Sequence, residues 1–464
     1  MSQTAQILSR LGFSRRANAR GSMLREFLTL AWPVILARVG IMLMGLTDAV
    51  VVGNYSAREL GFHALGWAPT TIVLGAAVGL LQGVQVMTAR HLGEGRRDAV
   101  GGVLRRGLVY SLWLGLGSVA VLAGFGPLFL HHIGLEPGLA DGSSRALLVF
   151  AWSLPSYFIA TAGIYFLEAL PRPKPGMAAM WVANGVNLAA NLWLVPGHSG
   201  LPVDGAVAAG WATFIARTVL AVWVLTFISR LPEARALGLF SRPVDGPGAA
   251  REQRRIGYGA GASMFIEVGA FAAMTLIAGE IGGLEAAAWS SVLNFSALVF
   301  MGPLGLSTAT AVLVGRAFGA RDGAGVARAG KLGFGVVIAL TALVALVTGL
   351  GAPLIARGYT HDPALLALIT PALWLGCVFF IPDGLQVVAA QALRARADVW
   401  LPTVCHLFSY ALVMIPLGFW LARPMHMGVN GLMWAVIVAS FASGALLVWR
   451  FLLLTRRSLA GERA

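Results

Sequence analysis

Long apolar runs, interrupted by short polar and mostly basic segments, extend along almost the whole chain. A helix that crosses a bilayer needs about 20 predominantly apolar residues, and twelve runs approach or exceed this length. They lie near residues 25–52, 62–89, 107–126, 146–168, 176–195, 205–229, 256–279, 286–314, 332–356, 366–393, 399–421 and 429–453. The pattern predicts an all-α polytopic membrane protein with twelve transmembrane helices.

The composition agrees with a membrane protein and excludes other classes. Hydrophobic residues make up 58% of the 464 residues and charged residues only 12%, whereas about 25% of a soluble protein is charged. So few polar side chains cannot cover a water-exposed surface, which excludes a cytosolic enzyme and a disordered chain. Cys377 and Cys405 both lie in apolar runs, and the eight histidines form no HExxH motif. We therefore predict no disulfide framework and no zinc site.

The basic residues predict the orientation of the chain in the membrane. If the twelve helices alternate in direction, 28 of the 34 Lys and Arg residues fall on one side and four on the other. Arg38 and Arg217 remain inside predicted helices. Because positive loops stay in the cytoplasm, we expect a multi-pass protein of the bacterial inner (plasma) membrane with both termini cytoplasmic. The net charge of +14 then reflects this orientation, and we expect no nucleic-acid partner. Residues 1–24 lack the features of a signal peptide.

The two halves of the chain resemble each other. A shift of 226 residues aligns Gly79 with Gly305, Arg90 with Arg316, and several other Gly and Pro positions. A shift of 223 aligns Ala169-Leu170 with Ala392-Leu393 and Gly205 with Gly428. Each half contains an even number of helices, so we expect two parallel repeats around a central cavity, as in alternating-access transporters.

The repeat predicts two six-helix lobes joined by the longest basic loop. The expected organisation is a cytoplasmic basic arm (1–24), an N-lobe with helices 1–6 (25–229), a cytoplasmic inter-lobe loop (230–255), a C-lobe with helices 7–12 (256–453) and a cytoplasmic tail (454–464).

Three acidic residues, Asp48, Glu267 and Asp383, fall inside apolar runs. A charge at the bilayer centre costs at least ~2.5–3.5 kcal/mol, so each is a candidate functional residue. Glu267 and Asp383 both lie roughly 15 Å from the cytoplasmic ends of their helices, and this equal depth allows them to share a site. The alternative is that they are structural acids bonded to neighbouring helices.

Other polar groups extend these candidates. Pro382 leaves a backbone carbonyl without its usual donor beside Asp383, and Asn294 or Ser290 could add oxygen ligands, as hard cations require. The same arrangement suits a proton. In the N-terminal half, Asn187 and Asn191 share one helix face at a depth similar to that of Asp48, and they form a second polar cluster or join helices.

The sequence resembles the multidrug and toxic compound extrusion (MATE) family, in its bacterial NorM-type branch. The matching stretches are LAWPVI (30–35), GLTDAVVVG (45–53), VNLAAN (186–191), FIEVGAF (265–271), LNFSALVFM (293–301) and DGLQVVAAQALR (383–394). They occur in family order over nearly the whole chain.

The resemblance implies a V-shaped pair of lobes and a monomer that exports amphipathic, mostly cationic drugs in exchange for Na⁺ or H⁺, with no other cofactor. Glu267 and Asp383 match the family's C-lobe cation-binding acids and would also line the substrate cavity. They would be the metal ligands if the ion is Na⁺. Asn294 and Asp48 match further cation-coupling positions, and Asn187 and Asn191 match an N-lobe polar cluster.

Five positions depart from the family pattern. Phe379 stands where a Tyr often precedes the helix 10 acid, and Trp289-Ser290 replaces a His-Gln pair. Arg38 replaces a small residue, and Ile41 replaces a Gln. Because the loss of the Tyr and Gln side chains removes oxygen atoms, these changes weaken the case for Na⁺ in particular.

Other functions fit the sequence less well. A flippase for lipid-linked precursors, from the same wider superfamily, would have more helices and a cationic cavity. An intramembrane enzyme would need a nucleophile–base or metal set, which the His, Asp and Glu positions do not supply, so we predict no enzymatic activity. A general sugar transporter would have a charged signature that the 2–3 loop lacks.

Overall fold

The fold is a bundle of long helices, and helices are the only regular secondary structure among the described residues. The computed structural model covers residues 13–132, 135–241 and 246–461. The first half contains α2 (Phe13–Tyr55), α3 (Ala57–Leu80), α4 (Gln82–Gly93), the short 3₁₀ helix η1 (Arg97–Ala99), α5 (Val100–His132), α6 (Pro137–Trp152), α7 (Leu154–Ala169), α8 (Lys174–Leu194) and α9 (Gly205–Ser229). The second half contains α10 (Pro247–Ile281), α11 (Gly283–Gly319), α12 (Gly323–Tyr359), α13 (Pro363–Ala395), α14 (Trp400–His406), the π-helix η2 (Leu407–Met414), α15 (Ile415–Ala422) and α16 (Gly428–Gly461).

The helices account for twelve crossings. Eleven segments within the described ranges are long and apolar enough to span a membrane, with α3–α4, α6–α7 and α14–α15 each counting as one. The remaining crossing is α8, which has 21 residues but a lower mean hydropathy because it carries Asn184, Asn187 and Asn191. The prediction of an all-α polytopic protein is therefore confirmed.

Most helices extend beyond the apolar runs that predict them. Residues 13–24 of the expected arm belong to α2, residues 247–255 of the expected inter-lobe loop belong to α10, and residues 454–461 of the expected tail belong to α16. Residues 1–12, 242–245 and 462–464 lie outside the described ranges. The apolar pattern marks the part of a helix that suits hydrocarbon, whereas the backbone hydrogen bonds continue into the polar flanks.

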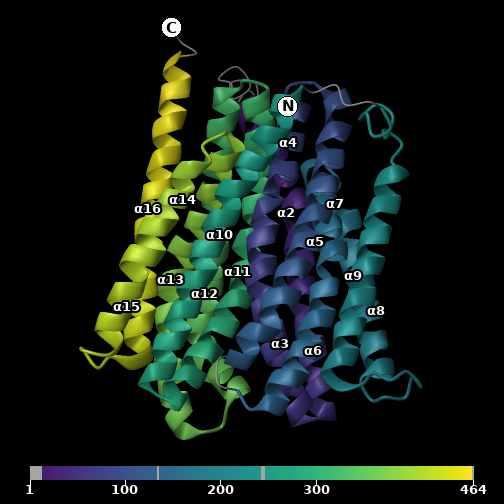
Figure 1. The fold of residues 1–464 in the computed structure, drawn as a ribbon. Helices are drawn as coiled ribbons and strands as arrows, with labels where there is room; N and C mark the ends of the chain where they lie inside the picture. The colour runs from purple at the N-terminus through teal and green to yellow at the C-terminus, as the bar shows by residue number, and fades with distance from the viewer. Residues whose placement is uncertain (1–12, 133–134, 242–245, 462–464) are drawn as a thin grey trace, which may run out of the picture.

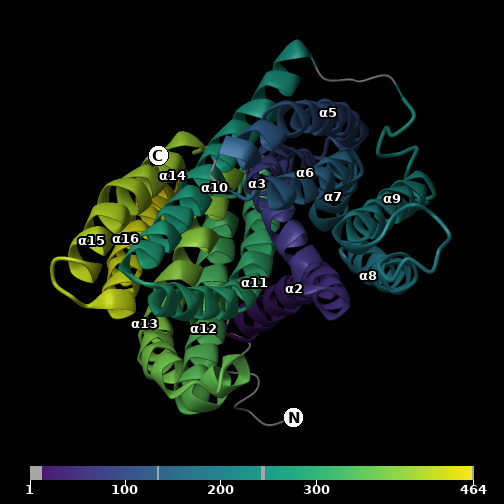
Figure 2. The same ribbon diagram turned by 60° about the horizontal axis from the view of Figure 1, so that its bottom comes forward.

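The two halves form two lobes that lie side by side (Figures 1 and 2). Helices α2–α9 make the N-lobe and α10–α16 the C-lobe, and the lobes meet where α2 and α4 pack on α11 and where α3 packs on α10. In Figure 2, α2 and α3 lie next to α11 and α10 between the outer helices of each lobe.

The contacts between the lobes reproduce the sequence repeat. Gly79 of α3 lies against Gly261 of α10, and Gly305 of α11 lies against Ile35 of α2. Both pairs are related by the same shift of 226 residues, so one contact is made twice around a pseudo-twofold axis. Gly95 and Arg321 obey the same shift and both have positive φ, at 76° and 56°.

Farther along the chain, the shift between the halves changes. Arg90 donates to the carbonyl oxygen of Ala395 at 2.9 Å, and Arg316 donates to that of Ala169 at 2.7 Å. Ala169 therefore corresponds to Ala395, at a shift of 226, and the sequence alignment of Ala169 with Ala392 is wrong by about one helical turn. Gly205 and Gly428, which begin α9 and α16 with positive φ, do follow the shift of 223.

Hydrogen bonds between the lobes occur only at one end of the bundle, among the residues that can be described. This end carries the arginines that cross from each lobe to the other, and we refer to it as the basic end. Besides the bonds to Ala395 and Ala169, Arg90 donates to the carbonyl oxygen of Arg394 at 2.9 Å, and Arg316 pairs with Glu26 at 3.1 Å. Hydrogen bonds to charged groups contribute about 1.5–3 kcal/mol each, so these arginines hold the lobes together at the basic end.

Two equivalent glycines allow the backbones to approach at this end. A Cβ atom on Gly93 would collide with the carbonyl oxygen of Arg316, and one on Gly319 would collide with that of Arg90. A backbone carbonyl cannot move aside as a flexible side chain can. The closed arrangement of the basic end therefore requires glycine at both positions.

We predict that Gly93→Ala and Gly319→Ala each separate the lobes at the basic end, because the added methyl group meets the opposite backbone. The control is Gly335→Ala on α12, where a Cβ would meet open space. Spin labels on the exposed Ala236 and Ala324, in a cysteine-free background, would report the distance between the lobes. Longer distances in both variants and an unchanged distance in the control are expected. Unchanged distances in all three variants would show that the contact between the lobes tolerates a side chain at Gly93 and Gly319.

Candidate functional site

The C-lobe brings Glu267 and Asp383 together through one side chain. Gln386, one helical turn after Asp383 on α13, donates from Nε2 to Oε1 of Glu267 and to Oδ1 of Asp383, at 3.3 Å in both cases. Asp383 is 5% exposed and Gln386 is fully buried. The two acids that lie at equal depth in the sequence therefore share one site.

The local sequence explains why both acids face the interior of the lobe. Ser263, Glu267, Ala270 and Met274 recur at helical spacing on α10, and Ser263, Ala270 and Met274 are buried. Glu267 thus lies on the helix face that packs into the C-lobe core.

Asp383 lies where α13 packs closely on α16. Helix α13 continues unbroken through Pro382, and the carbonyl oxygen of Pro382 lies 3.1 Å from where a Cβ of Gly444 on α16 would be.

Polar atoms near the acid pair remain without hydrogen-bond partners. Within the described residues, these buried atoms include Oε1 of Gln386 and Nε and Nη2 of Arg394 on α13. Arg394 is close enough to attract Glu267 electrostatically, yet no basic side chain forms an ion pair with either acid in the described part of the chain. Buried polar atoms are rarely left unpaired in proteins. The oxygen of Gln386 could bind a water molecule or a cation, whereas the N–H groups of Arg394 need an acceptor such as water.

The tyrosine nearest to this site lies on η2, whereas the family resemblance expects one on α13 at the position of Phe379. Phe379, at the position where the family often has Tyr, is buried against Phe380, with the ring centroids 5.9 Å apart. Tyr410 of η2 is fully buried, and its phenol lies within electrostatic range of both Glu267 and Asp383. The π-helix that carries Tyr410 is visible only in the structure. π-helical turns often occur at functional sites, but the apolar sequence of residues 407–414 does not predict one, so sequence reasoning missed this tyrosine.

The candidate ligand Asn294 lies away from the acid pair. It is eleven residues from the start of α11, whereas Asp383 is twenty residues from the start of α13 at the same end of the bundle. Asn294 is exposed and accepts a hydrogen bond from Tyr359, at the end of α12, at 3.1 Å. No hydrogen bond in the described structure joins it to Glu267 or Asp383, so its part in this site stays a prediction. Ser290, one turn earlier, is also exposed.

The N-lobe contains a second acidic site, in which one carboxylate accepts three side-chain hydrogen bonds. Asp48 of α2 is 2% exposed, and its carboxylate accepts from Asn187 at 2.9 Å, from Asn191 at 2.7 Å and from Thr213 at 2.5 Å. The polar cluster expected from Asp48, Asn187 and Asn191 is thus assembled by α2 and α8, and α9 adds Thr213. Sequence reasoning missed Thr213, although a polar residue one helical turn before the intramembrane Arg217 was a usable signal.

The two intramembrane arginines are both held by N-lobe groups. Arg38 pairs with Glu168 at 3.3 Å, and Gln85 donates to the same carboxylate at 2.8 Å. All three are buried. Glu168 lies near the end of α7, but this helix ends inside the protein, so its carboxylate is buried and needs these partners. Arg217 donates to Ser153 at 2.7 Å and lies over the Tyr157 ring.

No larger metal-binding group accompanies these residues. The described residues contain no group of three or more His, Cys, Asp or Glu side chains arranged to hold a metal ion. Any cation at the C-lobe site would therefore be bound by two carboxyl groups together with amide, hydroxyl or water oxygens.

Comparison with known families identifies the fold. The MatE family model matches residues 33–193 and again residues 260–420, so each lobe is one copy of it. The chain belongs to the MatE family. The MATE resemblance seen in the sequence is thereby confirmed, and the second match begins 227 residues after the first, close to the shift found within the sequence.

Individual relatives agree with the MATE assignment. The chain is 56% identical to "Probable multidrug resistance protein NorM" of Caulobacter vibrioides over 93% of this chain and 92% of that protein. It is 30% identical to the protein of the same name from Aromatoleum aromaticum, over 92% and 93%. A structure described as "Outward-facing conformation of a multidrug resistance MATE family transporter of the MOP superfamily" has a TM-score of 0.87 at 17% identity, covering 95% of this chain and 97% of that one. This MATE chain is accordingly a multi-pass membrane protein.

We predict that Glu168→Leu destabilises the fold by about 3–5 kcal/mol, because it leaves Arg38 buried without its counter-charge. Replacing both Arg38 and Glu168 by Leu should recover most of this loss, since two matched apolar residues need no partner. The free energy of unfolding of the purified protein is the measurement. Glu280→Leu serves as control: its ion pair with Arg423 is exposed and should contribute less than about 1 kcal/mol. Equal losses in the single and double variants would contradict the pairing.

Proposed function

We propose that this chain is an antiporter that exports amphipathic, mostly cationic drugs in exchange for Na⁺ or H⁺, by alternating access. Its MATE membership and its similarity to proteins named as multidrug resistance proteins support efflux of small organic molecules. The observation that carries the coupling is the pair Glu267 and Asp383, a half-buried and a buried acid that share a single donor.

The number of donors distinguishes this pair from the other intramembrane acids. Asp48 accepts three side-chain hydrogen bonds, and Glu168 has both an arginine and a glutamine. Glu267 and Asp383 have only Gln386 between them. Two carboxylates at bilayer depth with so little compensation are costly to leave charged, so the site favours an incoming proton or Na⁺.

The cycle that we propose makes cation and drug compete for the C-lobe. In this cycle the drug would bind between the lobes, where the carboxyl groups attract its charge and aromatic and Met side chains contact its apolar surface. A cation entering from outside neutralises Glu267 and Asp383 and shifts α10, α11 and α13, which weakens drug binding. Because the pair is shared by α10 and α13, a change in its charge alters the contact between these helices.

The seal at the basic end provides the second element of the cycle. With the basic end in the cytoplasm, as the positive-inside rule indicates, the hydrogen bonds of Arg90 and Arg316 close the cytoplasmic side. This arrangement corresponds to a state open to the outside. Breaking these bonds would let the lobes rock about their seam. We place the protein in the bacterial inner membrane as a monomer with small-molecule substrates.

A flippase for lipid-linked precursors is the alternative, and the arginines argue against it. A shared fold does not decide the substrate: a structure described as showing "Reverse polarity of binding pocket" from Pyrococcus furiosus has a TM-score of 0.86 at 16% identity. Here Arg38 is neutralised by Glu168, and Arg217 lies against the Tyr157 ring. Both arginines are buried, at 7% and 3% exposed, so neither is accessible to a pyrophosphate group.

We predict that Asp383→Asn and Glu267→Gln each lower gradient-driven drug efflux by about tenfold or more, because coupling energies of 1–3 kcal/mol correspond to 5–150-fold effects. The measurement is ethidium efflux from proteoliposomes with a Na⁺ gradient or a pH gradient imposed one at a time. The gradient that drives the wild-type protein identifies the ion.

Glu280→Gln is the matched control for these variants. It makes the same chemical change on α10, at an exposed position paired with Arg423, and should leave efflux unchanged. Unchanged efflux and unchanged ion dependence in both Asp383→Asn and Glu267→Gln would refute the coupling role of the pair.

A further inference from the structure

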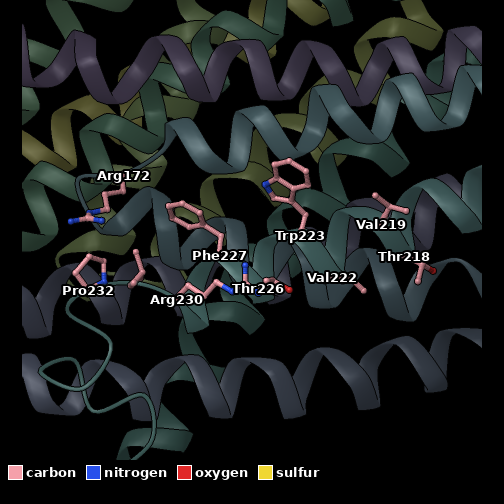
Figure 3. A pocket seen from close by; sticks show the side chains of 10 residues that line it. Arg172, Thr218, Val219, Val222, Trp223, Thr226, Phe227, Arg230 and Pro232 are labelled. Atoms are coloured by element: carbon pink, nitrogen blue, oxygen red, sulfur yellow. The ribbon is translucent and has the colours of Figure 1, made fainter.

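A groove on the outer surface of the N-lobe has the shape and charge of a lipid site. It has a volume of about 660 Å³ and follows one face of α9 from Thr218 to Phe227, continuing past Arg230 to Pro232 (Figure 3). Its walls are mostly apolar, with Val222 59% and Trp223 44% exposed. Arg172, from the segment between α7 and α8, lies at the same end as Pro232.

The face of α9 that forms this groove points away from the protein core. The opposite face carries Leu220, Val224 and Ile228, which are buried against the N-lobe. Since α9 is a membrane-spanning helix, the medium along its outer face is lipid. An apolar groove at this depth is therefore filled by acyl chains rather than by water.

The length of the groove matches one leaflet of the membrane. Thr218 and Arg230 are twelve residues apart, which corresponds to roughly 18 Å along a helix. Half of the hydrocarbon core of a bilayer measures roughly 15 Å. A lipid whose tails lie beside Val219 and Val222 would therefore place its phosphate at the level of Arg230, where α9 has ended and the basic end begins.

Positive charge gathers where the headgroup would lie. Arg230 is exposed and forms no ion pair in the described structure. Arg172 pairs with Glu233 at 2.6 Å through one nitrogen, which leaves other donors of its guanidinium available. Arginines in a pocket between transmembrane helices are a recurrent binding site for anionic lipid headgroups.

We propose that this groove is a binding site for one anionic phospholipid of the leaflet at the basic end, with its phosphate beside Arg230 and Arg172 and its tails along α9. The site is separate from the drug and cation sites, and the inference depends only on the placement of α9 in a membrane. The lipid would bind the N-lobe at the point where the connection to the C-lobe, residues 230–241, begins.

The test is native mass spectrometry of the purified full chain, titrated with phosphatidylglycerol or with phosphatidylcholine of the same acyl chains. The wild-type protein should retain one phosphatidylglycerol in preference to phosphatidylcholine. Arg230→Gln should reduce this preference about fivefold, the effect of roughly 1 kcal/mol per arginine near the headgroups. Arg456→Gln, an exposed arginine on α16 outside the groove, should leave the preference unchanged.

A second variant tests the groove itself. Val222→Trp fills the apolar part without changing any charge, so it should reduce the retention of both lipids. Equal retention of the two lipids by the wild-type protein would overturn the proposal, and so would an undiminished preference in Arg230→Gln. Displacement of phosphatidylglycerol by soluble glycerol 3-phosphate at the same concentration would also overturn it, because the tails would then contribute nothing.

Discussion

The cost of placing a carboxyl group in hydrocarbon governs the interior of this protein. Asp48, Glu168, Glu267 and Asp383 all lie within helices that are otherwise apolar, and each must obtain compensation from neighbouring helices. In the N-lobe this compensation is generous, with amide, hydroxyl and guanidinium donors aimed at Asp48 and Glu168. In the C-lobe it is limited to one amide donor and the charge of Arg394, which forms no ion pair with either acid. Fully bonded acids fix helix positions, whereas poorly bonded acids respond to whatever cation reaches them.

The duplication that built the two lobes did not preserve this chemistry. At the shift of 226 that relates α2 to α10, Glu267 corresponds to Ile41 and Asp48 corresponds to Met274, which is fully buried in the C-lobe core. The repeated scaffold supplies the same helix directions and the same interlobe contacts twice. Its polar sites were placed independently in each copy, so the two lobes have the same architecture but different electrostatics.

The sequence predicted the fold more completely than the site, for physical reasons. Hydropathy is a property of each segment alone, so twelve crossings and their repeat could be recognised without knowing how the helices pack. Depth along a helix also follows from counting, which brought Glu267 and Asp383 to one level. The direction in which a side chain points depends on packing against other helices. For that reason Asn294, at a plausible position in the chain, lies exposed beside Tyr359, while Glu168 and Tyr410 belong to buried clusters that no local pattern reveals.

Several contacts between the lobes are made by backbone atoms. Glycines face carbonyl oxygens, and arginines from each lobe donate to main-chain oxygens of the other. Every amino acid has the same backbone carbonyl group, so substitutions on the helix that supplies the acceptors leave these acceptors unchanged. The seam can therefore survive extensive evolutionary divergence as long as a few positions stay small, consistent with a common fold among chains that share only 17% of their residues.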